Sequence, residues 1–117
     1  MKIREAAEQL RSVRVFLDRS VDVALLRRLM TEATHSPSDL GMFLQTLMLL
    51  LLRRRAGRCA QECWVLYPQT LGQLLNPPAD HVLFCGMAIG YAGNEHPVNR
   101  LVSDRAPLNE IAAFHGI

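Results

Sequence analysis

The sequence predicts an α+β fold in which helices surround a small sheet. Three stretches carry this prediction: an amphipathic segment over residues 21–34, a strongly apolar segment over residues 38–57, and a nearly continuous apolar run over residues 81–91. The chain has 117 residues and shows no internal repeat, so we expect one domain over residues 1–117. If it folds alone, its radius of gyration should be about 13 Å.

The N-terminal part is expected to form two helices that each bury one face. Residues 2–10 place apolar side chains at the helical i, i+3, i+4, i+7 spacing. The second helix should run from about residue 21 to residue 34, with Ser20 as its N-cap. It should end before Pro37, because proline disfavours helical backbone in the residue before it. The short turn that follows makes this helix and the next one neighbours.

The helix expected over residues 38–57 is apolar on every side between residues 40 and 52. Ser38 or Asp39 should cap its start, and Gly57 should supply the left-handed residue after its end. It is too short for a bilayer, which needs about 20 apolar residues, so we expect it to be enclosed by protein. A second copy of the chain is the expected cover, and neighbouring elements of the same chain are the alternative.

The second half is expected to contain shorter elements. Gly86 and Gly90 lie inside the apolar run, where glycine indicates close approach by another element. The expected elements are a loop or helix start over residues 59–64, a helix over 68–76, a buried strand over 81–91 and a last helical turn or two over 107–114.

Charge and cysteine content limit the partners and the location that the sequence predicts. A net charge of +2 is too small to predict a nucleic-acid partner, and no segment predicts a membrane partner. Three cysteines without a secretory segment favour free thiols and a cytoplasmic location. The spacing of Cys59 with Cys63, and of His81 with Cys85, also allows a zinc site. A small zinc-stabilised domain is therefore a rival hypothesis.

Arg11, Ser12 and Arg14 form a candidate anion-binding cluster. Guanidinium groups offer paired donors that match phosphate oxygens, and a serine hydroxyl adds a short donor. A solvated basic turn would give the same local pattern, so the cluster by itself leaves both interpretations open.

Several motifs resemble the nitroreductase family, which comprises FMN-dependent oxidoreductases. The first is R-S-V-R-V-F at residues 11–16, followed by a leucine-rich helix and S-P-S at 36–38. The others resemble the family's C-terminal region in the same order: DLGMFLQTLML at 39–49, CGMAIGY at 85–91, PVN-x-LVSDR-x-PL at 97–108 and FHG at 114–116. In the family, an asparagine, a Gln-Pro-Trp motif and several further elements follow the Pro-Ser. Here Ser38 runs directly into Asp39, so the chain resembles a nitroreductase with its central segment removed.

The resemblance implies a nitroreductase-like fold with a reduced sheet, assembled as an intertwined homodimer that binds FMN between its subunits. The implied cofactor-binding residues are Arg11, Ser12, Arg14 and Arg105 toward the phosphate and polar side of the flavin, Pro37 and Ser38 along the flavin, and Gln61 from the partner subunit. NAD(P)H would supply electrons, and a nitroaromatic, quinone or similar small molecule would accept them. No catalytic acid or base is expected, because the redox chemistry belongs to the cofactor. The absent segment motivates a second hypothesis, a non-catalytic dimeric helical module derived from such an enzyme.

Overall fold

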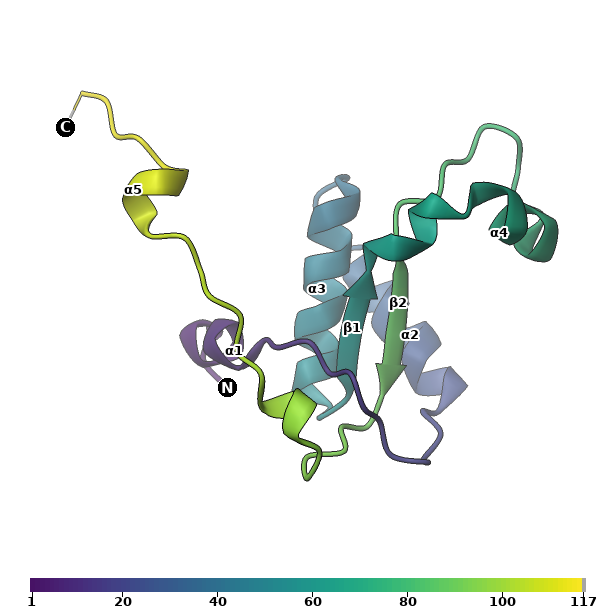
Figure 1. Ribbon diagram of the computed structural model, residues 1–117, viewed down its shortest axis with the longest axis horizontal. Coiled ribbons are helices and arrows are strands. Elements are labelled where there is room, and N and C mark those ends of the chain that lie inside the picture. Colours follow the sequence, from purple (N-terminus) through teal and green to yellow (C-terminus); the bar gives the residue numbers. More distant parts are fainter. Residues whose placement is uncertain (117) are drawn as a thin grey trace.

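The computed structural model describes residues 1–116 and confirms the predicted fold class, with helices packed against a two-stranded sheet (Figure 1). No helix within these residues is long and apolar enough to cross a membrane. The α-helices are α1 (Ile3–Gln9), α2 (Val23–Ala33), α3 (Leu40–Arg53), α4 (Pro68–Leu75) and α5 (Leu108–Ile111). The strands are β1 (Gly57–Gln61) and β2 (Gly86–Gly90), and two 3₁₀ turns are η1 (Glu62–Leu66) and η2 (Pro97–Arg100).

Aspartate side chains set the starts of α2 and α3. The carboxylate of Asp22 accepts a hydrogen bond from the backbone N–H of Ala24 at 2.9 Å, and that of Asp39 accepts one from Met42 at 3.2 Å. Asp39 is one of the two caps that the sequence predicts for α3. The predicted Ser20 cap is wrong, because Asp22 caps the helix two residues later and α2 begins correspondingly late.

Helix α3 ends in a left-handed turn at Arg55. This residue has φ of 57°, and the N–H of Ala56 donates to the carbonyl of Leu51 at 3.0 Å. The prediction that Gly57 is the left-handed residue is wrong. The chain turns earlier, and Gly57 becomes the first residue of β1, opposite Gly90 of β2.

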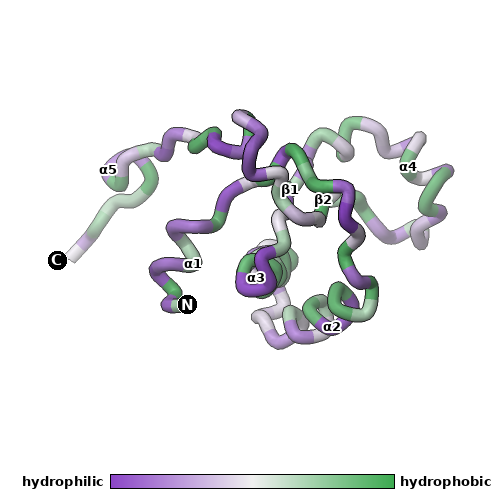
Figure 2. The backbone as a smooth tube through the Cα atoms, turned by 90° about the horizontal axis from the view of Figure 1, so that it is seen from below, coloured by the Kyte–Doolittle hydropathy of each residue, from purple (hydrophilic) through white to green (hydrophobic). Residues whose placement is uncertain are grey.

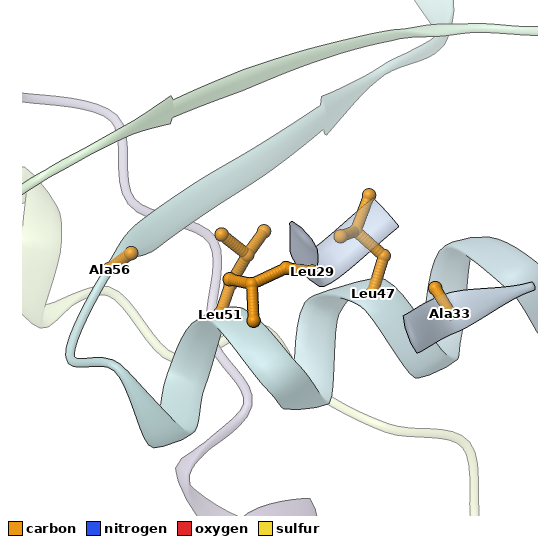
Figure 3. Packing of buried hydrophobic residues seen from close by; sticks show 5 residues of the cluster. All are labelled: Leu29, Ala33, Leu47, Leu51 and Ala56. Atoms are coloured by element: carbon orange, nitrogen blue, oxygen red, sulfur yellow. The ribbon is translucent and has the colours of Figure 1, made fainter. Parts of the chain in front are cut away.

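The core lies between α2, α3 and the sheet (Figure 3). Leu29 of α2 is 1% exposed and Leu51 of α3 is 0% exposed. Full burial of a leucine side chain contributes about 1.5–3 kcal/mol, so these contacts between α2 and α3 are a main source of stability. The buried members of the core are Leu29, Ala33, Leu47, Leu51 and Ala56, and Met87 and Ile89 of β2 pack against them.

The sheet is antiparallel and shorter than the predicted strand. Only residues 86–90 of the expected 81–91 strand pair with β1, because the chain leaves the sheet at Glu62 to form η1. Strand β1 itself was not predicted: its residues were expected to belong to a loop or helix start. Pairing with β2 is what fixes their extended backbone.

The face of the sheet away from α3 is covered at close range. Residues 12–17 pass in front of both strands in Figure 1. A Cβ atom added to Gly90 would lie 2.6 Å from the ring of Phe16, and one added to Gly86 would lie 2.5 Å from Trp64. Both distances are too short for a real side chain. The prediction that Gly86 and Gly90 mark close approach by another element is confirmed.

Two arms extend from the core, so the chain is less compact than predicted. Its radius of gyration is 16.6 Å. The α4 arm (residues 62–85) and the C-terminal arm (residues 101–116) lie at opposite ends of the molecule, and both carry apolar segments (Figures 1 and 2). Val82 in the first arm is 91% exposed and Ile111 in the second is 69% exposed. Residues 1–116 of a single copy leave these side chains uncovered.

Helix α3 is also covered only in part. Its first turn exposes Leu40 and Met42, although Leu47 and Leu51 are buried. Neighbouring elements of the same chain therefore enclose one side of α3, and its cover by a second copy stays a prediction.

Arg58 on β1 is the buried charged side chain within residues 1–116, with 3% exposure. Its Nε and Nη2 atoms have no hydrogen-bond partner among these residues, and burial lowers the pKa of the guanidinium below its usual value. Arg58 stands opposite Ile89 in the register, so both side chains point to the core face. An unpartnered buried cation at this position opposes folding.

Replacing Arg58 by methionine, which has a similar length and no charge, should raise the free energy of unfolding by about 1–3 kcal/mol. Urea denaturation of the wild type and R58M measures the change. Arg100→Met on an exposed turn is the control and should leave stability within about 0.5 kcal/mol. A destabilised R58M would show that the guanidinium has an acceptor in solution.

Arg55→Gly should raise the free energy of unfolding by about 1 kcal/mol, because glycine adopts left-handed backbone without the Cβ clash. The neighbouring Arg54→Gly is the matched control, since Arg54 has φ of −90° and gains nothing from glycine. Thermal or urea unfolding distinguishes the two variants. Equal effects in both would contradict the assigned turn.

Candidate anion-binding site

Residues 11–17 are held in place by backbone hydrogen bonds at two points. Ser12 and Arg58 form a parallel bridge, in which the N–H of Val13 donates to the carbonyl of Arg58 at 2.9 Å. The N–H of Leu17 donates to the carbonyl of Tyr91 at 2.7 Å. The segment therefore spans from the edge of β1 to the residue after β2.

The side chain of Asn99 fixes the middle of this segment. Its carboxamide oxygen accepts hydrogen bonds from the N–H groups of Arg14 at 2.8 Å and Val15 at 3.1 Å. Its amide nitrogen donates to the carbonyls of Val15 at 2.7 Å and Gly93 at 2.9 Å. One partly buried side chain thus satisfies four backbone groups. Its role was not predicted, and its place in the P-V-N motif was the only available signal.

Four of the residues that the sequence nominates for cofactor binding line one cavity of about 230 Å³. Arg11, Ser12 and Arg14 come from the N-terminal segment, and Arg105 comes from the C-terminal arm. Ser103 adds a second hydroxyl that was not predicted. Residues about 90 positions apart in the sequence therefore meet at one site, next to the Asn99 anchor.

The arginines of this cavity are available to a ligand. Neither Arg11 nor Arg14 forms an ion pair with another residue of 1–116. Arg105 donates only to the backbone carbonyls of Ser103 and Asp104, at 3.0 and 3.1 Å. Three guanidinium groups with spare donors around one small cavity favour a phosphate or similar dianion.

The other nominated residues lie elsewhere in a single copy. Pro37 and Ser38 line a separate cavity of about 290 Å³ beside the start of α3. Gln61 ends β1, about 10 Å along the strand from Arg58, and its carboxamide oxygen accepts a hydrogen bond from Trp64 Nε1 at 2.9 Å. The structure therefore brings together the four residues assigned to the phosphate, and leaves the three assigned to the flavin ring apart from them.

The cysteines do not form a metal centre within the described residues. No group of three or more His, Cys, Asp or Glu side chains in residues 1–116 is placed to hold a metal ion, and all three cysteines are free thiols. His81 instead contacts Asp80, at 3.0 Å from Nδ1 to the carboxylate. The zinc hypothesis therefore has no geometric basis in this part of the chain.

Asn99→Ala should lower the free energy of unfolding by about 2–4 kcal/mol, because it removes four hydrogen bonds of about 1 kcal/mol each. Hydrogen exchange at the Arg14 and Val15 amides should become faster. Asn94→Ala, on the exposed turn nearby, is the control. Unchanged protection of Arg14 and Val15 in N99A would contradict the assigned anchor.

The curated proteins that match the sequence are named as nitroreductases or nitrobenzoate reductases. No family profile matches the sequence. Chloronitrobenzene nitroreductase of Comamonas testosteroni is 36% identical over 74 residues, which are 63% of this chain and 33% of that enzyme. The nitrobenzene nitroreductase of Ectopseudomonas oleovorans is 34% identical over a stretch of the same length. The chain thus spans about a third of the length of the curated relatives it matches.

Solved structures of nitroreductases share the fold of this chain. An FMN- and NADPH-dependent nitroreductase from sphigopyxis sp. strain HMH superposes with a TM-score of 0.91 and 23% identity, over 100% of both chains. At this identity the likeness establishes the fold alone. The sequence relatives and the shared fold agree with the motifs at both ends of the chain, and the chain has a nitroreductase-like fold.

Proposed function

We propose that this chain binds FMN and acts as a nitroreductase-type flavin oxidoreductase. NAD(P)H would be the electron donor, and a nitroaromatic, quinone or similar small molecule the acceptor. The observation that carries the proposal is the cavity of Arg11, Ser12, Arg14 and Arg105 in a chain with a nitroreductase-like fold. Its sequence relatives are named for nitroaromatic reduction, and a structural neighbour is described as FMN- and NADPH-dependent.

The cavity fits the phosphate of FMN in size and charge. Its volume of about 230 Å³ is too small for a flavin ring system together with its side chain, and suits a phosphate with the adjoining part of a polyol chain. Each charge-assisted hydrogen bond to phosphate contributes about 1.5–3 kcal/mol. Three arginines would therefore supply a large share of the affinity, and the ring would lie outside this cavity.

A second copy of the chain is the proposed source of the remaining site. Pro37, Ser38 and Gln61 lie apart from the arginine cavity within one copy, so they would complete a flavin site only across an interface. The two apolar arms and the open side of α3 supply apolar surface for such a homodimer. Burial of this surface would also enclose the central helix.

The residues of this chain would bind and orient the cofactor. Arg11, Arg14 and Arg105 would neutralise the phosphate, Ser12 would donate a short hydrogen bond, and Asn99 would keep Arg14 in place through its backbone. FMN, when bound, supplies the transfer of electrons between donor and acceptor. No side chain is assigned to proton transfer.

Arg14→Ala should weaken FMN binding about tenfold or more, since the loss of one charge-assisted bond removes at least 1.4 kcal/mol. Quenching of flavin fluorescence during titration of the purified chain measures the dissociation constant. Riboflavin, which lacks the phosphate, should bind the wild type and R14A equally weakly. Arg27→Ala on the exposed face of α2 is the control variant and should bind FMN as the wild type does.

Failure of the wild type to bind FMN would overturn this proposal. FMN binding without NADPH oxidation in the presence of a quinone would instead favour the second candidate, a non-catalytic module that keeps the cofactor site. The observation that favours this candidate is the direct passage from Ser38 to Asp39, where the motifs of the nitroreductase family lead us to expect an asparagine and a Gln-Pro-Trp segment.

A further inference from the structure

The lining of the arginine cavity also includes one acidic residue. Glu8, near the C-terminal end of α1, lines the cavity together with Ala7 and Leu10. Backbone carbonyls at the end of a helix carry partial negative charge. The cavity therefore combines the cationic side chains of Arg11, Arg14 and Arg105 with one carboxylate at the end of α1.

The side chain of Glu8 is 60% exposed, and its carboxylate has one hydrogen-bond partner within residues 1–116. Its Oε1 accepts a hydrogen bond from Arg4 Nε at 2.8 Å, one turn earlier on the same helix. An ionised carboxylate has two oxygens and about four acceptor sites, and it has no donor. The Oε2 atom of Glu8 accepts no hydrogen bond within residues 1–116 and is available to a donor from a ligand.

This arrangement favours a phosphate that carries hydroxyl groups over a simple anion. A carboxylate on the wall of a phosphate site repels the phosphate, and a hydroxyl group beside that phosphate turns the same carboxylate into a favourable acceptor. Sulfate or inorganic phosphate cannot offer such hydroxyl groups at a distance from its charge. A phosphate monoester of a polyhydric alcohol offers both features within one short chain.

We propose that Glu8 is a specificity-determining residue that accepts a hydrogen bond from a hydroxyl of the polyol chain next to the bound phosphate. The inference rests on the proposed function, in which that chain is the ribityl group of FMN. It assigns two parts of the ligand to residues of one cavity: the phosphate to the arginines and the hydroxyl to Glu8.

The test compares three ligands by isothermal titration calorimetry at constant ionic strength: FMN, ribose 5-phosphate and inorganic phosphate. The variants are Glu8→Met, which has no strong acceptor, and Glu8→Gln, which keeps a neutral one. Glu32→Gln is the matched control, because Glu32 also forms an i,i+4 contact with an arginine, at 3.9 Å on α2 and outside the cavity. Thermal unfolding verifies that each variant is folded.

The expected result is a change of opposite sign for the two kinds of ligand. E8M should bind FMN and ribose 5-phosphate about three- to tenfold more weakly, with E8Q intermediate. Both variants should bind inorganic phosphate about two- to fivefold more tightly, since a repelling charge is gone. E32Q should match the wild type with all three ligands.

Tighter binding of every ligand by E8M would overturn the inference, because Glu8 would then only repel anions. Unchanged affinities in E8M would also overturn it. A wild type that distinguishes ribose 5-phosphate from inorganic phosphate through Glu8, yet does not bind FMN, would refute the proposed function and retain this inference. Absence of binding by all three ligands would refute both.

Discussion

The carboxamide of Asn99 is the contact on which the candidate site depends. Its four hydrogen bonds join the N-terminal segment, the residue after β2 and the turn that begins the C-terminal arm. Backbone groups in a loop need partners when they leave solvent, and here one side chain supplies them. Because Arg14 is bonded through its backbone, its guanidinium stays free to point at a ligand.

The sheet imposes the second constraint. Two strands alone are marginally stable in water and need cover on their faces. The leucines of α2 and α3 cover one face, and Phe16 and Trp64 lie against glycines on the other. The segment that carries Arg11 and Arg14 is therefore part of the packing of the sheet. The anion cavity and the packing of the sheet therefore depend on the same backbone segment.

Local signals in the sequence were sufficient for several elements. Helix α4 begins at Pro68 and ends beside Asn76, whose left-handed φ of 43° and following Pro77 stop the helix where the sequence indicates. Tertiary contacts decided the others. Strand β1 has no alternating apolar pattern and exists through its pairing with β2. Two capping residues lay within one turn before α2, and nothing in the sequence favoured Asp22 over Ser20.

The candidate site was predictable to the same extent. Motifs nominated Arg11, Ser12, Arg14 and Arg105, and the structure brings these residues to one cavity, while their role in cofactor binding stays a prediction. Their distance in sequence gave no information on how the two ends of the chain meet. The meeting of these two segments depends on the hydrogen bonds of the Asn99 side chain and on the course of the chain after β2. Ser103 and Glu8 belong to the cavity for the same reason, and no spacing rule indicated either of them.

The C-terminal arm has few contacts with the rest of the chain beyond the cavity, where Leu101, Val102, Ser103 and Arg105 meet the N-terminal segment. An anion bound by Arg11 and Arg14 on one side and Arg105 on the other would link the N-terminal segment to the C-terminal arm. Because a ligand stabilises whichever state binds it, occupancy would protect the arm from proteases in proportion to the ligand concentration. Susceptibility of the arm to cleavage would then report on whether the cavity is filled, independently of any redox assay.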